Sequence, residues 1–204
     1  MEANRDHQGV QQLATAPGGV AVGVTTVAAG GLFSRLLAWD QATLLAARRW
    51  RTPRRTVVAR ALTRLGDASG WTFVGLAFFA TLHPIGTNLG LRLSVAALFA
   101  TLLSQSLKRI LHRARPDIAI AGFVPESANP DRFSFPSGHT CAAFAVALAF
   151  LGVPFGLGTL FLALAFAIGA SRVYLGAHYP LDVGAGALLG SMAGLVTHLI
   201  FSSL

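Results

Sequence analysis

Three short segments of the sequence carry residue types that suit phosphate chemistry. They are KRILHRARP at residues 108–116, FPSGH at residues 135–139 and SRVYLGAHYPLD at residues 171–182. Each segment adjoins an apolar run. Guanidinium and ammonium groups bind phosphoryl oxygens, while imidazole moves protons or attacks phosphorus. Together these groups favour phosphoryl transfer at the end of a helix bundle.

The first segment places two cations on one face of a predicted helix. Lys108 and Arg115 are seven residues apart, which is nearly two helical turns. Pro116 then disfavours helical geometry at Arg115. The guanidinium would give a phosphoryl group bidentate contacts, and the ammonium would give it a point charge. The alternative is that both side chains extend into lipid headgroups at the end of a span.

The second segment predicts a helix N-terminus that binds an anion. Ser137 stands at the N-cap position, directly before an apolar helix. The backbone N–H groups of the first turn attract an anion, and Gly138 lets the backbone approach it closely. His139 would point into that site and protonate a leaving oxygen. The alternative is a capped helix start with an interfacial histidine.

The third segment combines a cation with a histidine and a carboxylate. Arg172 ends one apolar stretch, and the next begins at Pro180. Proline fits the first turn of a helix, which places Asp182 inside that turn and His178 just outside it. A carboxylate about one turn away can hold one imidazole nitrogen as N–H and leave the other free to attack phosphorus. A purely structural hydrogen bond between His178 and Asp182 is the alternative.

The composition indicates that a bilayer surrounds these segments. Hydrophobic residues make up 53% of the 204 residues, charged residues only 12%, and the mean hydropathy is +0.60. Each span takes roughly 20 apolar residues, so the chain has room for five or six spans in one membrane domain. The net charge of +8 comes from basic residues clustered in two loops, which favours anionic lipid or phosphate partners over nucleic acid.

Hydropathy predicts an all-α chain with six spans. Residues 1–17 form a polar tail, residues 18–66 hold a weak first span at 18–34 and a basic segment at 35–66, and residues 67–204 form the core. The remaining spans are predicted at 69–83, 89–107, 139–153, 156–173 and 181–202. The basic segment, with eight arginines, predicts amphipathic interfacial helices broken near Pro53, or else a solvated loop. Six spans would bring all three chemical segments to one membrane face.

The three segments together resemble a known family. Type 2 phosphatidic acid phosphatases, also called lipid phosphate phosphatases, have the signatures K-x6-RP, PSGH and SR-x5-H-x3-D. This sequence matches all three in order, without a departure at any motif position. The similarity in span layout covers about residues 66–202.

The resemblance implies a six-helix membrane bundle with its site near one membrane surface and no need for a metal or other cofactor. His178 would attack phosphorus, Asp182 would orient and charge-stabilise His178, and His139 would protonate the leaving group. Water would then hydrolyse the phosphohistidine. The implied substrate is a phosphomonoester or pyrophosphate of a membrane lipid or polyprenyl-linked molecule. The residues implied to bind its phosphate are Lys108, Arg115, Ser137, Gly138 and Arg172.

Two other functions fit the same residues. A phosphotransferase of the same superfamily would keep the nucleophile and pass the phosphoryl group to another lipid or sugar instead of water. A membrane anion transporter would use the arginines and histidines to line an anion path.

Two arguments predict opposite orientations of the site in the membrane. The positive-inside rule directs the arginine-rich face toward the cytoplasm. The resemblance to bacterial family members directs it outward across the plasma membrane. We expect the outward orientation, because basic residues around a phosphate site have a functional reason to be there.

Overall fold

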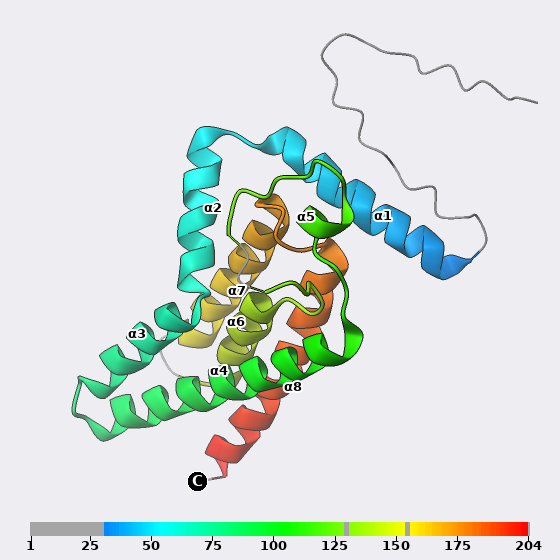
Figure 1. The fold of residues 1–204 in the computed structure, drawn as a ribbon. Coiled ribbons are helices and arrows are strands. Elements are labelled where there is room, and N and C mark those ends of the chain that lie inside the picture. Colours follow the sequence, from blue (N-terminus) through cyan, green and yellow to red (C-terminus); the bar gives the residue numbers. More distant parts are fainter. Residues whose placement is uncertain (1–30, 129–130, 154–155, 204) are drawn as a thin grey trace, which may run out of the picture.

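The computed structural model describes residues 31–128, 131–153 and 156–203, and the named elements of these residues are all helices (Figure 1). They are α1 (Leu32–Ala47), the short 3-10 helix η1 (Arg48–Trp50), α2 (Pro53–Leu65), α3 (Ala68–Phe79), α4 (Pro84–Leu111), α5 (Pro116–Ala119), α6 (Gly138–Ala149), α7 (Leu157–Tyr174) and α8 (Pro180–Ser202). The predicted all-α fold is therefore confirmed for the described residues.

Three helices are long and apolar enough to cross a membrane, which indicates a membrane protein. They are α4 with 28 residues, α7 with 18 and α8 with 23. The apolar helices α3 and α6 have only 12 residues each, so each extends about 18 Å against roughly 30 Å of hydrocarbon. The predicted bundle of six spans is therefore not confirmed. The predicted first span at 18–34 lies outside the described residues except for its last four positions.

Helix α6 lies at the centre of the bundle, between α4, α7 and α8 (Figure 1). Its residues 140–147 are all buried, as expected for a helix that is apolar all round. Glycines let α8 approach α6 closely. A Cβ at Gly190 would overlap the carbonyl oxygen of Cys141, and one at Gly186 would lie 2.6 Å from that of Ser137. This packing fixes the first turn of α6 against the first turns of α8.

The basic segment forms α1, η1 and α2, so its helical interpretation is confirmed for residues 35–50 and 53–65. The break falls at residues 51–52, where Thr52 caps α2 by accepting a hydrogen bond of 3.3 Å from the Arg55 N–H. Pro53 takes the first helical position. Helix α1 crosses the end of the bundle that also carries α5 and the loop before α6 (Figure 1). This arrangement places α1 beside the chemical segments.

Candidate active site

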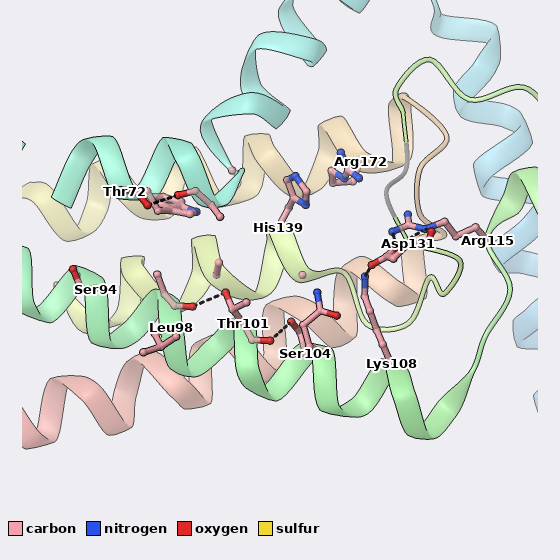
Figure 2. Close-up of a pocket in the computed structure, with 17 residues that line it drawn as sticks. Thr72, Ser94, Leu98, Thr101, Ser104, Lys108, Arg115, Asp131, His139 and Arg172 are labelled. Carbon is pink, nitrogen blue, oxygen red and sulfur yellow. Dashed lines mark hydrogen bonds and ion pairs between the residues drawn. The ribbon is translucent and has the colours of Figure 1, made fainter. Parts of the chain in front are cut away.

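The three chemical segments meet around one cavity of about 390 Å³ between α3, α4 and α6 (Figure 2). Its polar end is lined by Lys108, Arg115, Asp131, His139 and Arg172. From there the cavity continues along α3 and α4, where its lining includes Trp71, Thr72, Ala97, Leu98 and Thr101. The cavity therefore joins a cationic end to a largely apolar extension.

Two of the predicted cations hold one carboxylate, that of Asp131. The Lys108 Nζ lies 2.5 Å from Oδ2 of Asp131. Arg115 donates from Nε to Oδ1 of Asp131 at 2.9 Å and to its carbonyl oxygen at 2.8 Å, and its Nη2 also pairs with Oδ1. Burial alone would raise the pKa of Asp131, but the bonds from Lys108 and Arg115 lower that pKa below its ordinary value. Asp131 is therefore ionised at neutral pH.

Arg172, the third predicted cation, lines the cavity from the end of α7. It is 3% exposed, and its Nη1 donates to the Thr63 hydroxyl of α2 at 2.5 Å. Its buried Nε has no hydrogen-bond partner among the residues that the structure describes. Burying a charged donor without a partner is costly. Since Arg172 also lines the cavity, its guanidinium contributes positive charge to the polar end.

His178 lies behind Arg115 and is 1% exposed. Its Nε2 is 3.2 Å from Nη1 of Arg115, and that Nη1 also donates to the Ala177 carbonyl at 2.7 Å. Its Nδ1 is 3.5 Å from Oδ2 of Asp182. This nitrogen forms no hydrogen bond with Asp182 or with any other residue that the structure describes. Burial, reinforced by the charges of Arg115 and Arg172, lowers the pKa of His178 well below its ordinary value. The ring is therefore neutral at neutral pH and has the lone pair that a nucleophile needs.

The N-terminus of α6 supplies Gly138 and His139 to the cavity wall, whereas the residues that line it do not include Ser137. Ser137 is fully buried and holds the N-cap position, but its side chain accepts a hydrogen bond of 2.9 Å from the Thr140 hydroxyl instead of capping the helix. Its N–H donates to the Asp182 carbonyl at 3.0 Å. Ser137 therefore links α6 to α8 and does not line the cavity.

His139 lies between two cavities and is paired with a carboxylate that sequence analysis missed. Its Nε2 is 2.5 Å from Oδ1 of Asp67, the N-cap residue of α3. His139 and Arg172 also line a second, polar cavity of about 410 Å³. The other residues around that cavity include Arg60, Thr63, Arg64, Glu126 and Ser127.

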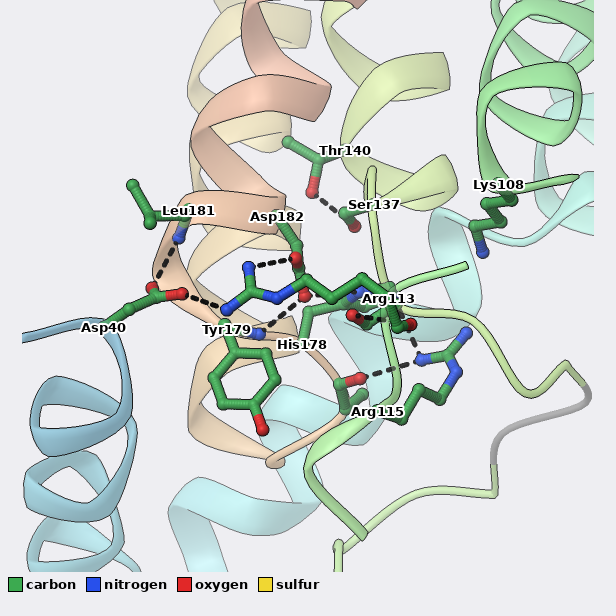
Figure 3. A network of polar contacts seen from close by, with 12 residues as sticks. Asp40, Lys108, Arg113, Arg115, Ser137, Thr140, His178, Tyr179, Leu181 and Asp182 are labelled. Atoms are coloured by element: carbon green, nitrogen blue, oxygen red, sulfur yellow. Dashed lines mark hydrogen bonds and ion pairs between the residues drawn. The ribbon is translucent and has the colours of Figure 1, made fainter. Parts of the chain in front are cut away.

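A buried network of ion pairs, which the sequence analysis also missed, contacts the Asp182 carboxylate (Figure 3). Arg113 bridges two carboxylates that are 0% exposed, with Nη1 at 2.7 Å from Asp182 and Nη2 at 2.6 Å from Asp40 of α1. Asp40 accepts a further bond of 2.8 Å from the Leu181 N–H, and Asp182 accepts one of 2.9 Å from the Tyr179 N–H. The guanidinium also stacks on the Tyr179 ring, 4.2 Å from its centroid.

The network gives Asp182 a fixed orientation and ties α1 to the start of α8. The one signal for it in the sequence is Asp40 itself, a single acid in the run LLAWDQATLL. A charge among apolar residues is retained when a partner compensates it. Within the described residues, no group of three or more His, Cys, Asp or Glu side chains could hold a metal ion.

Known proteins resemble this chain in sequence and in structure. A family model described as the PAP2 superfamily matches residues 89–204. The lipid A 1-phosphatase of Rhizobium johnstonii is 39% identical over 120 residues, which cover 56% of this chain and 48% of that protein. The decaprenylphosphoryl-5-phosphoribose phosphatase of Mycobacterium tuberculosis is 34% identical over 146 residues, which cover 71% of this chain and 79% of that protein.

A solved structure extends the similarity to the fold. The crystal structure of the first transmembrane PAP2 type phosphatidylglycerolphosphate phosphatase from Bacillus subtilis superposes with a TM-score of 0.70 at 28% sequence identity. The match covers 83% of this chain and 88% of that one. In contrast, the chain spans about half the length of the lipid A 1-phosphatase that it matches.

Proposed function

Because this chain belongs to the PAP2 superfamily, we propose that it is a membrane phosphatase that removes a terminal phosphate from a lipid or polyprenyl-linked substrate. One observation carries the proposal: a single cavity joins three buried cations to an apolar wall of α3 and α4. A phosphate fits the cationic end, and a hydrocarbon chain fits the apolar extension. Relatives named as phosphatases of lipid A and of a decaprenyl-linked sugar support the same substrate class.

In the proposed first step, Nε2 of His178 attacks phosphorus, so that a P–N bond forms and the P–O bond to the lipid breaks. Asp182 lies on the Nδ1 side of the ring, with Oδ2 at 3.5 Å, where in the proposed step it would accept a hydrogen bond from Nδ1–H and stabilise the positive charge that the ring acquires. The developing charge on the phosphoryl oxygens is neutralised by three cations and by the backbone of one glycine. These groups are Lys108, Arg115, Arg172 and Gly138.

In the proposed second step, water attacks the phosphorus of the phosphohistidine, the P–N bond breaks, and inorganic phosphate and free His178 are formed. In the first step His139 gives its proton to the departing lipid oxygen, and in the second step it takes a proton from the attacking water. The position of His139 on the walls of both cavities supports this role, because the polar cavity gives water access to the same ring. Ser137 holds α6 against α8 in this scheme and does not touch the phosphate.

A lipid panel tests the proposed function. Purified protein in detergent, with a chelator and no added metal, is expected to release inorganic phosphate from at least one of four lipids. These are phosphatidic acid, phosphatidylglycerol phosphate, a polyprenyl diphosphate and a polyprenyl-linked sugar phosphate. Glycerol 3-phosphate is the control. Its kcat/KM should be lower than that of the lipid substrate, because it has no hydrocarbon chain to occupy the apolar extension of the cavity. Release from none of the lipids, or phosphoryl transfer only to an added alcohol or sugar, would contradict hydrolysis.

We also propose that the site faces outward across the plasma membrane. Ala128→Cys places a thiol on an exposed residue beside the polar cavity, whereas the native Cys141 is fully buried. A membrane-impermeant maleimide should label Ala128→Cys in intact cells. Leu82→Cys is the matched control, because Leu82 is 91% exposed in the turn before α4, at the other end of that helix from Lys108. It should react only after lysis, and the reverse pattern would show a cytoplasmic site.

A further inference from the structure

We propose that Asp40 of α1 is a positioning residue for the proposed nucleophile, and that it acts through Arg113 and Asp182. Its carboxylate shares the Arg113 guanidinium with Asp182, and this sharing leaves negative charge on Asp182 to stabilise the His178 ring as the ring becomes positive. The inference rests on the proposed function, because it concerns the same nucleophile. Asp40 precedes residues 89–204, which the family model matches, so the charge comes from a helix that this model does not cover.

The burial of Asp40 indicates that its charge has a role. Helix α1 buries Asp40 and Leu44, each 0% exposed, whereas its large apolar residues Leu32, Phe33 and Trp39 face outward. Taking a carboxylate out of water costs free energy, which its ion pair and hydrogen bonds must offset. An apolar side chain would attach α1 to the bundle without that cost. The acid at this contact is therefore better explained by what its charge does to its neighbours.

Arg113 divides its positive charge between two buried carboxylates (Figure 3). Its Nη1 lies 2.7 Å from Oδ1 of Asp182, and its Nη2 lies 2.6 Å from Oδ2 of Asp40. One cation and two ionised carboxylates leave this network with an excess of one negative charge. Without Asp40, Arg113 and Asp182 would form a neutral pair. A cation shared between two acids thus compensates each of them less than a cation paired with one.

The excess negative charge lies on the side of His178 where the reaction needs it. Oδ2 of Asp182 is 3.5 Å from Nδ1, while Nε2, the attacking atom, lies 3.2 Å from Nη1 of Arg115. When Nε2 bonds to phosphorus, the ring becomes cationic. Burial and the charges of Arg115 and Arg172 lower the pKa of His178, so they oppose a cationic ring. A negative charge held on the Nδ1 side counters them during the step, because charges interact strongly in a site with little water.

Asp40→Asn tests the inference in single turnovers of p-nitrophenyl phosphate with the protein in excess. Release of nitrophenol then reports cleavage of the P–O bond alone, and this leaving oxygen needs no proton. The variant preserves the size of the side chain and removes its charge. The saturating rate constant is expected to fall about tenfold, the size expected for one charge acting over several ångströms inside a protein. The affinity for inorganic phosphate should not weaken, because the described residues that line the cavity do not include Asp40 or Arg113.

Two further variants separate the charge of Asp40 from its shape. Asp40→Glu keeps the charge on a longer side chain and should therefore be faster than Asp40→Asn. The double variant Asp40→Asn/Arg113→Gln removes one charge of each sign, which restores the single negative excess, and the glutamine amide can still donate to Asp182. It should recover part of the rate that Asp40→Asn loses, whereas purely structural contacts would make a second loss add to the first. Asp117→Asn is the matched control, because it removes a carboxylate from an exposed position of α5 and should leave the rate constant unchanged.

Three outcomes would overturn the inference. They are a wild-type rate constant in Asp40→Asn, a double variant slower than Asp40→Asn, and weaker phosphate binding that accounts for the whole loss of rate. Thermal midpoints in detergent show whether each variant is folded. If Asp40→Asn does not fold, Asp40→Glu decides, since a rate constant near that of the wild-type protein supports the inference and a slow folded variant overturns it. Phosphate release from a lipid of the panel by the wild-type protein would still support the proposed function in either case.

Discussion

His178→Ala is expected to lower kcat by at least about 10⁴-fold while the protein remains folded, because a covalent mechanism cannot proceed without its nucleophile. The ring is buried behind Arg115 and packed against the start of α8, so its loss leaves the cavity walls in place. Turnover of the best lipid substrate measures the effect. His112→Asn is the control, because it removes an imidazole from an exposed position at the end of α4 and should leave kcat unchanged.

The covalent intermediate provides a second measurement for the same prediction. Rapid quenching of the wild-type protein into base, with substrate carrying a labelled terminal phosphate, should trap label on the protein, because phosphohistidine is stable to base. The label should map to His178 and be absent from His178→Ala. Retained turnover in that variant, or label on another residue, would contradict the covalent mechanism. Loss of folding is excluded by comparing the thermal midpoints of the variant and the wild-type protein in detergent.

The sequence predicts the start of α8 and its chemical residues because the signals there are local. Pro180 occupies the first helical position, and Asp182 lies in the first turn and accepts the Tyr179 N–H. A proline and an acid two positions later specify that geometry without help from the remainder of the chain. The same holds for Gly138 and His139, since the turn from loop to apolar helix is visible in five consecutive residues.

The acidic partners of these residues could not be predicted, because each pairing joins distant parts of the chain. Asp40 meets Arg113 across 73 positions, Asp67 meets His139 across 72, and Asp131 meets Lys108 across 23. Periodicity and capping signals extend over one or two turns and contain no information about such pairs. Asp131 in particular stands in a polar loop where a carboxylate would be expected to face water.

The span lengths were overestimated for a related reason. The apolar run at residues 69–83 predicts one span, but α3 ends at Phe79 and the chain turns at Leu82, which has a φ of 50°. The run at 139–153 likewise yields a helix that ends at Ala149, and Gly152 has a φ of 71°. Hydropathy counts apolar residues and does not detect where the backbone turns, so apolar turn residues are assigned to the helix.

His139→Ala is expected to lower kcat for a lipid phosphate by about 10²- to 10⁴-fold, the range for removal of a general acid. The proposed reason is that an alkoxide leaves poorly without a proton. A bound phosphate dianion beside His139 favours the protonated ring, and Asp67, 2.5 Å from Nε2, stabilises the resulting cation. An aryl phosphate such as p-nitrophenyl phosphate needs no proton on its leaving oxygen. Its first step should therefore be nearly as fast in the variant as in the wild-type protein.

Stopped-flow release of nitrophenol separates the two steps of this prediction. The variant should show a burst of about one equivalent followed by slow turnover, because water activation is lost while phosphohistidine formation continues. Asp67→Asn keeps the ring and removes only its charged partner, so its kcat for lipid phosphate should fall by less than that of His139→Ala. An equal loss of the burst rate and of lipid turnover would show instead that His139 binds the phosphate. In that case the proton for the leaving oxygen must come from another group at the polar end of the cavity.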